Sequence, residues 1–309
     1  MVSYLQAVVI GLLQGVTELF PVSSLGHSVL VPALIGGSWE HLVTQSSTST
    51  SATSPYLAFI VALHVATAFA LIFYFRADWA RIVKGLLVSI RDRRIDTPTQ
   101  RLGWLIVIAT IPVGITGLVL EHTFRTLFAK PLAAAIFLTI NGLILFAGER
   151  LRRRSDALAT EKPRAGSNPP GAAKPPVTVA DGRRLDTLQY REAGIIGFFQ
   201  TFALLAGISR SGITMVAGLT RGLDHEDAAR FSFLLATPVI LAAGVLKLPG
   251  LAGSAGAHIH GQVIVGVLCA GVAAYLSTRF LIRYFRTRSL TPFAIYSVVM
   301  GGVCIAAFA

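Results

Sequence analysis

Charged residues are scarce in this sequence. They make up 14% of its 309 residues, whereas hydrophobic residues make up 53%. An ordinary soluble protein has a charged fraction of about 25%. This composition excludes a disordered chain, a coiled coil and an ordinary soluble enzyme, and it favours a helical protein that crosses a membrane several times.

Cysteine is also scarce, and basic residues are missing from the beginning of the chain. The two cysteines, Cys269 and Cys304, both lie in apolar stretches, which excludes a disulfide framework and a CxxC metal site. No Lys or Arg precedes Arg76, so we expect no cleaved signal peptide. The net charge of +12 comes from basic residues between apolar segments. We attribute it to the positive-inside rule and predict no nucleic-acid partner.

The apolar segments fall into two sets of five. The first set covers residues 3–20, 24–36, 56–75, 102–120 and 131–149, and the second covers 190–206, 211–220, 228–247, 261–285 and 291–308. Between the sets, residues 150–190 are rich in Arg, Pro, Gly and Ala, which predicts a flexible cytoplasmic linker. The chain therefore divides into a first repeat at 1–149, this linker, and a second repeat at 191–309.

The second segment of each set is too short to cross a bilayer, which takes about 20 residues. We therefore predict that residues 3–36 and 191–220 are re-entrant helical hairpins, each followed by three transmembrane helices. Because three spans are an odd number, the two repeats must be inverted relative to each other. The predicted fold class is all-α, a polytopic membrane protein of two inverted repeats.

Internal similarity and charge distribution agree with this prediction. Shifting the sequence by 186 residues superimposes identical residues, including Gly11 on Gly197, Gln14 on Gln200 and Ser23 on Ser209. The predicted topology places 23 basic residues on the cytoplasmic side and 3 on the opposite side. It also places both termini outside and leaves Arg210 within the membrane.

The first predicted hairpin carries a charged residue and a polar loop. Glu18 follows Gln14 by four residues, so both lie on one helix face, where a carboxylate and an amide are able to hold a divalent cation. Ser23 and Ser24 stand where a short helix begins, and helix N-termini bind anions. His27 follows one turn later. Serine, histidine and carboxylate together form an activated nucleophile in many enzymes.

The second predicted hairpin repeats this arrangement with a cation. Ser209, Ser211 and Thr214 surround Arg210 at the start of another short helix. A guanidinium offers a fork of donors suited to phosphate, so we predict phosphate or pyrophosphate binding here. His64, in the third segment, could line the same site, but we favour a structural hydrogen bond for it.

These residues resemble a known family. Gln14-Gly-Val-Thr-Glu18 and the following Pro21-Val-Ser-Ser-Leu-Gly-His27 are similar to the E/Q-x-x-x-E and PVSS-x-GH motifs of bacterial undecaprenyl-pyrophosphate phosphatases, which are linked to bacitracin resistance. Residues 206–214 resemble the family's PGxSRSxxT motif, with Ala206 in place of proline. The resemblance covers nearly the whole chain.

The resemblance implies an activity and a location. The chain would dephosphorylate undecaprenyl (polyprenyl) pyrophosphate to the monophosphate on the outer face of the bacterial cytoplasmic membrane, recycling the carrier for peptidoglycan synthesis. It also implies a divalent cation, Mg²⁺ or Ca²⁺, which Glu18 and Gln14 would hold. Gln at position 14 leaves one carboxylate fewer for that metal.

The residues leave alternatives open. In the hypothesis we favour, Ser24 attacks the terminal phosphorus, and His27 is its general base or orients that base. Arg210 clamps the phosphates, and Glu18 binds metal or tunes His27. The other predicted substrate-binding residues are Gln14, Ser23, Ser209, Ser211 and Thr214. His27 is the alternative nucleophile. An inverted-repeat transporter or flippase, or a lipid-binding protein without activity, would use the same donors. The sequence also leaves a homodimer and the prenyl chain length open.

Overall fold

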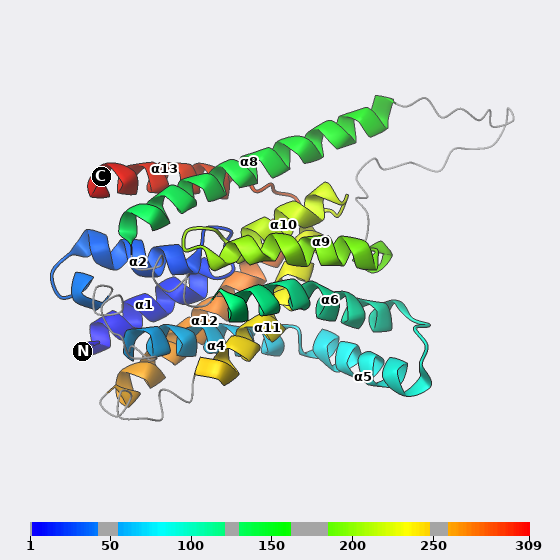
Figure 1. Ribbon diagram of the computed structural model, residues 1–309, viewed down its shortest axis with the longest axis horizontal. Helices are drawn as coiled ribbons and strands as arrows, with labels where there is room; N and C mark the ends of the chain where they lie inside the picture. Colours follow the sequence, from blue (N-terminus) through cyan, green and yellow to red (C-terminus); the bar gives the residue numbers. More distant parts are fainter. Residues whose placement is uncertain (1, 43–54, 121–129, 162–184, 248–258) are drawn as a thin grey trace, which may run out of the picture.

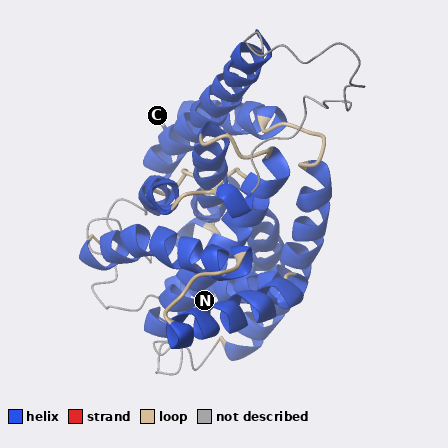
Figure 2. Ribbon diagram, turned by 90° about the vertical axis from the view of Figure 1, so that its right-hand side faces the viewer, coloured by secondary structure: helices blue, strands red, loops and turns tan. Residues whose placement is uncertain are grey.

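The computed structural model describes residues 2–42, 55–120, 130–161, 185–247 and 259–309. Within these ranges the chain forms helices and no strands (Figure 2). The first half contains α1 Tyr4–Thr17, α2 Ser24–Ile35, α4 Pro55–Tyr74, α5 Arg76–Asp92, α6 Pro98–Val119 and α8 Pro131–Glu161. The second half contains η1 Leu185–Thr187, α9 Tyr190–Gln200, η2 Thr201–Leu204, α10 Arg210–Thr220, α11 His225–Lys247, α12 His260–Tyr284 and α13 Thr291–Phe308.

Several of these helices are long and apolar enough to span a membrane, which confirms a polytopic membrane protein. The described residues hold 5 such helices, α6, α8, α11, α12 and α13. A sixth span results if α4 and α5 count as one, although the chain bends by 86° between them. Helices α1, α2, α9 and α10 have 14, 12, 11 and 11 residues.

Two parts of the predicted cytoplasmic surface are more ordered than the sequence suggested. Residues 76–92 lie between two predicted apolar segments and form the amphipathic helix α5, which the Trp104 indole N–H anchors to α6 by donating to Ser89 Oγ at 3.0 Å. Helix α8 continues through Glu161, so the first part of the predicted linker is helical. Its Arg, Leu and Ala residues are strong helix formers, which explains the continuation. The end of the predicted linker is also ordered, since it contains η1 and the first residue of α9. Residues 162–184 of that prediction lie outside the described residues.

Helices of the first half of the chain pack against helices of the second half. Helix α1 packs on α12, α9 packs on α6, and α8 lies along α13 (Figure 1). Two glycines that coincide when the sequence is shifted by 186 residues allow the first two contacts. A Cβ added at Gly11 would lie 2.5 Å from Gly266 O of α12, and one added at Gly197 would lie 2.3 Å from Ala109 O of α6. Only glycine fits at both equivalent positions, because the facing backbone leaves no room for a methyl group.

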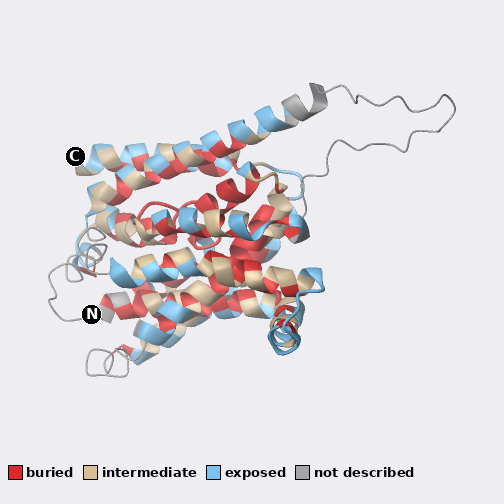
Figure 3. Cartoon of the chain, turned by 45° about the vertical axis from the view of Figure 1, so that its right-hand side comes forward, coloured by how far each residue is buried: buried red, intermediate tan, exposed pale blue. Residues whose placement is uncertain are grey.

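Buried residues concentrate in the middle of the assembly, and many apolar side chains face outward (Figure 3). Leu118 and Val119 of α6 and Leu268 of α12 are more than half exposed. Exposed apolar surface of this extent on spanning helices is surface for lipid tails. Polar residues buried in the middle of such a bundle must therefore have partners or a function.

Candidate active site

The first half contributes a sharp loop between α1 and α2, which we call the first loop (residues 18–23). Glu18 is the C-cap of α1, and Ser23 is the N-cap of α2, where its Oγ accepts from Gly26 N at 3.2 Å. Ser23 has φ 69°, in the region that side chains rarely adopt. This turn makes Ser24 the first residue of α2, so its hydroxyl lies at a helix N-terminus, the end whose dipole favours anions.

The second half contributes the equivalent second loop (residues 205–209), between η2 and α10. Gly207 has φ 108°, and an added Cβ would lie 2.4 Å from Ala134 O of α8. Ser209 is the N-cap of α10 and accepts from Gly212 N at 3.1 Å. Arg210 is therefore the first residue of its helix, as Ser24 is in α2.

The two loops are in direct contact. Gly207 N donates to Ser23 Oγ at 3.1 Å, so Ser23 serves both as a helix cap and as a link between the halves. Asn141 of α8 joins them a second time. Its Nδ2 donates to Pro21 O at 3.0 Å, and its Oδ1 accepts from Ser209 N at 2.9 Å. Residues far apart in sequence are thereby held at one place in the bundle.

Glu18 is the centre of the resulting cluster. Its Oε1 accepts from Arg210 Nη2 at 2.7 Å, and its Oε2 accepts from Ser24 Oγ at 2.5 Å. Gln14 Nε2 donates to the same Oε2 at 3.1 Å. The Glu18 side chain is only 5% exposed, so the Arg210 cation compensates a carboxylate that would otherwise be buried at a high cost.

His64 of α4 completes this cluster. Its Nε2 lies 3.2 Å from Glu18 Oε2, and its Nδ1 lies 2.8 Å from Ile60 O. A histidine whose two nitrogens both face oxygen acceptors satisfies both only as the imidazolium, which donates twice. The structural hydrogen bond that the sequence favoured is present, to Ile60 O, and His64 also contacts the site carboxylate. Sequence reasoning could not see this contact, since α4 lies outside both loops.

A cavity of about 220 Å³ opens beside these groups. Its polar lining comes from Glu18, Ser23, Ser24, His64, Gln200, Ser209 and Arg210. Its apolar lining includes Ile60 of α4, Val113 of α6 and Val239 of α11. The cavity therefore combines a polar surface from both loops with an apolar surface from three spans, as a ligand with a charged head and a hydrocarbon tail requires.

His27 does not pair with Ser24, contrary to the prediction. Its Nδ1 lies 2.7 Å from Ser23 O, and its Nε2 lies 2.7 Å from Tyr296 OH. The Ser24 hydroxyl donates to Glu18 instead. His27 also lies outside the cavity lining. The physical reason is the geometry of the helical turn. Nδ1 of His27 pairs with the carbonyl oxygen four residues earlier, that of Ser23, and this contact directs the ring toward α13.

The remaining predicted residues lie at or beside the cluster. Ser211 Oγ is 3.0 Å from Ser209 Oγ, which ties the two hydroxyls to each other. Thr214 Oγ1 donates to Arg210 O at 2.7 Å and lies outside the cavity lining. Gln14 Oε1 is buried, and no described residue donates to it. Asn141 and Gln200 were missed, although a buried amide in an apolar segment is itself a signal.

The oxygen donors fit a hard divalent cation in part. Such ions bind through one or two carboxylates and complete their shell with substrate phosphates and water. Here the donors are the Glu18 carboxylate and the unpaired Gln14 Oε1. Over the described ranges no group of three or more His, Cys, Asp or Glu residues comes together to form a complete site. A cation would therefore depend on substrate oxygens as well.

Comparison with known proteins agrees with this geometry. Residues 7–303 match the family described as bacitracin resistance protein BacA. Undecaprenyl-diphosphatase 2 of Frankia alni is 64% identical over 99% of this chain and 98% of its own length. Undecaprenyl-diphosphatase of Mycolicibacterium paratuberculosis is 58% identical over 98% and 96%, and that of Acidiphilium cryptum is 44% identical over 97% and 96%. The chain therefore belongs to the bacitracin resistance protein BacA family.

Proposed function

We propose that the cavity beside Glu18 and Arg210 is where this chain hydrolyses undecaprenyl diphosphate to undecaprenyl phosphate and phosphate. The family and the names of its relatives support this activity. It would recycle the lipid carrier for peptidoglycan synthesis and confer bacitracin resistance. The observation that carries the assignment is the contact of Ser24 and Arg210, from different halves of the chain, with one buried carboxylate.

Binding follows from the two surfaces of the cavity. The isoprenoid tail packs on the apolar surface, and the diphosphate takes the polar one. Arg210 has one guanidinium nitrogen, Nη1, that is buried without a partner among the described residues, whereas Nη2 is held by Glu18. Nη1 is therefore the donor available to a phosphate oxygen. The N-termini of α2 and α10 add N–H groups and favourable dipoles.

In the first chemical step Ser24 attacks the terminal phosphorus. The Ser24 Oγ–P bond forms, and the bond from that phosphorus to the bridging oxygen breaks. The electron pair leaves with the bridging oxygen, which releases the lipid monophosphate. Glu18 Oε2 receives the hydroxyl proton, because the hydrogen bond from Ser24 already points there. Arg210 stabilises the charge that develops on the phosphoryl oxygens.

In the second step water attacks the phosphoserine. An O–P bond forms from water, the Ser24 Oγ–P bond breaks, and phosphate leaves. Glu18 returns its proton to Ser24 Oγ, and both protons of the water leave on the phosphate, as dihydrogen phosphate. His64 stabilises the Glu18 carboxylate through its contact at 3.2 Å. His27 positions the start of α2 through its bonds to Ser23 and Tyr296.

A divalent cation, Mg²⁺ or Ca²⁺, belongs to this proposal. Glu18 and Gln14 Oε1 would hold it together with the diphosphate, where it would act as a Lewis acid on the phosphoryl oxygens. The two residues then serve to orient the head group in the cavity. Gln14 is suited to this because its amide nitrogen is already fixed by Glu18 and leaves the oxygen free.

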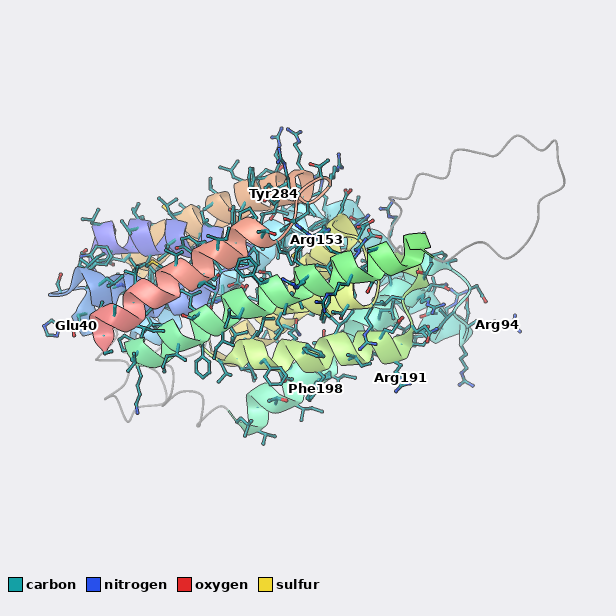
Figure 4. The ribbon with its side chains drawn as sticks, turned by 90° about the horizontal axis from the view of Figure 1, so that it is seen from above. Glu40, Arg94, Arg153, Arg191, Phe198 and Tyr284 are labelled. Atoms are coloured by element: carbon teal, nitrogen blue, oxygen red, sulfur yellow. The ribbon has the colours of Figure 1, made fainter. Side chains whose placement is uncertain are left out.

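The membrane arrangement in this proposal consists of two inverted repeats with re-entrant hairpins. Support comes from the short helices α1, α2, α9 and α10, and from the equivalent glycine contacts of Gly11 and Gly197. Both termini lie at one end of the molecule (Figure 1). Arg94 and Arg191 both lie in the half of the molecule away from Glu40 (Figure 4), as cytoplasmic basic residues would. The site would then face the outer side of the cytoplasmic membrane.

The test is phosphate release by purified protein in detergent with undecaprenyl diphosphate, with and without chelator. We expect release by the wild type and its loss in Arg210→Ala. A transporter or flippase would bind the lipid and release no phosphate, which would refute the proposal. The hydrogen bond from Ser24 to Glu18 favours the enzyme, because transport has no need of an activated hydroxyl.

A further inference from the structure

Gln200, the last residue of α9, has a side chain with an unexplained environment. It is 0% exposed, and neither its Nε2 nor its Oε1 has a hydrogen-bond partner in the described part of the chain. A buried amide that loses its water without gaining a partner destabilises the folded state. Buried glutamines normally have partners, so this one requires an explanation.

The position of Gln200 points to a ligand. It lines the cavity that also contains Glu18, Ser24 and Arg210. Among the buried side-chain atoms without a partner, Gln14 Oε1, Arg210 Nη1 and both amide atoms of Gln200 belong to this site or its immediate neighbours. Unpaired buried groups that gather at one cavity mark a place where a polar molecule supplies the missing bonds.

The comparison of the two repeats explains why Gln200 has no partner among the described residues. Gln14 and Gln200 are identical residues at the repeat offset, as are the caps Ser23 and Ser209. In the first repeat Gln14 Nε2 donates to Glu18. The residue equivalent to Glu18 in the second repeat is Leu204, which also lines the cavity and offers no acceptor. The second repeat keeps the amide and lacks the carboxylate.

The same comparison shows a division of roles. Where the first repeat has Ser24, the second has Arg210. The first repeat thus supplies an acidic residue and a hydroxyl, and the second supplies a cation and a free amide. An amide donor next to a guanidinium donor is a surface for an anion, because both present N–H groups to acceptor oxygens.

We propose that Gln200 is a substrate-binding residue whose Nε2 donates to a non-bridging oxygen of the diphosphate, beside Arg210 Nη1. The Oε1 atom accepts from a water that enters with the head group or from a protonated phosphate oxygen. This inference rests on the proposed function, because it requires a diphosphate in the cavity. It adds a contact between the second repeat and the head group, made by a residue outside the motif at residues 206–214 that contains Ser209 and Arg210.

The experiment compares Gln200→Leu with Gln100→Leu. Gln100 is a matched control, since it is also a buried glutamine but caps α6 by accepting from Asp96 N and Thr97 N, away from the cavity. Thermal unfolding in detergent and steady-state phosphate release from undecaprenyl diphosphate are measured for both. We expect Gln200→Leu to raise KM about 10- to 100-fold, because one hydrogen bond to a charged group is lost. We also expect it to raise the melting temperature, because a buried amide without partners is removed.

The control variant Gln100→Leu should behave in the opposite way, with a lower melting temperature and an unchanged KM.

Gln200→Glu is the second variant, because it keeps the shape of the side chain and replaces the N–H donor by a negative charge. It should impair turnover more than Gln200→Leu. Unchanged kinetics in either Gln200 variant, with an active wild type, overturn the inference. An inactive wild type would refute the proposed function instead. A second readout does not depend on turnover. Inorganic pyrophosphate should raise the melting temperature of the wild type and leave that of Gln200→Leu unchanged.

Discussion

Arg210 Nη2 donates to Glu18 Oε1 at 2.7 Å, although the two residues are 192 positions apart in the sequence. The arginine begins α10 and the glutamate ends α1, so each half of the chain contributes one charge. Both side chains are largely buried, at 13% and 5% exposed. This pair therefore joins the two loops and prepares the cavity for an anion, because Arg210 keeps a second nitrogen for a ligand.

The first prediction concerns the role of this ion pair. Arg210→Ala should abolish turnover, and Arg210→Lys should lower kcat/KM by about 100-fold, since an ammonium cannot bridge carboxylate and phosphate as the guanidinium does. In a double-mutant cycle with Glu18→Gln, unfolding free energies should show coupling of about 0.5–3 kcal/mol. Additive free energies would contradict a direct interaction. Circular dichroism of each variant checks that the helices are retained.

The second prediction separates the two serines of the first loop. Ser24→Ala should lower phosphate release at least about a thousandfold, as removal of a nucleophile does, with little change in melting temperature. Ser23→Ala should destabilise the fold by about 1–3 kcal/mol, because Gly26 N and Gly207 N both lose their acceptor. Mass spectrometry of enzyme quenched in denaturant at neutral pH, where phosphoserine and phosphohistidine both survive, should locate phosphate on Ser24. Phosphate trapped on His27 would assign the nucleophile to the histidine.

The third prediction concerns the glycine at the tip of the second loop. Gly207→Ala should lower both the melting temperature and turnover, since φ is 108° and the new Cβ would meet Ala134 O. Gly114→Ala is the control, because nothing lies within 4 Å of its added Cβ and alanine is the better helix former. Equal melting temperatures for the two variants would rule out this close approach.

The fourth prediction concerns the divalent cation. Chelation should abolish phosphate release, and added Mg²⁺ or Ca²⁺ should restore it. Gln14→Glu should lower the cation concentration needed for half-maximal activity, because a second carboxylate adds a charged oxygen ligand. Gln14→Leu should raise that concentration. Activity that persists unchanged in chelator would exclude a role for Gln14 in metal binding.

The fifth prediction concerns Asn141, which links the loops. Asn141→Leu should lower the melting temperature and turnover together, because Pro21 O and Ser209 N lose their partner in a buried place. Asn141→Asp should be milder, since it keeps the acceptor for Ser209 N. Hydrogen exchange at residues 18–24 and 205–210 should accelerate in Asn141→Leu, and unchanged exchange would argue against the link.

The sequence by itself determined where the long apolar helices lie and which charged residues stand within apolar segments. The predicted apolar segments at 102–120 and 261–285 agree with the bounds of α6 and α12 to within a few residues. The reason is that burial in lipid requires continuous apolar stretches in which all backbone groups are paired. Glu18 and Arg210 could be singled out for the same reason, since a charge in such a segment is costly and must have a partner.

Only the tertiary structure decided the partners. The Ser24 hydroxyl contacts Glu18 and leaves His27 to Tyr296, 269 positions away, and Asn141 and His64 reach the site from helices with no recognisable motif. Sequence periodicity reports which face of a helix is apolar, and it carries no information on which distant side chain that face meets. Those contacts follow from the packing of two halves against each other, which the fold alone creates.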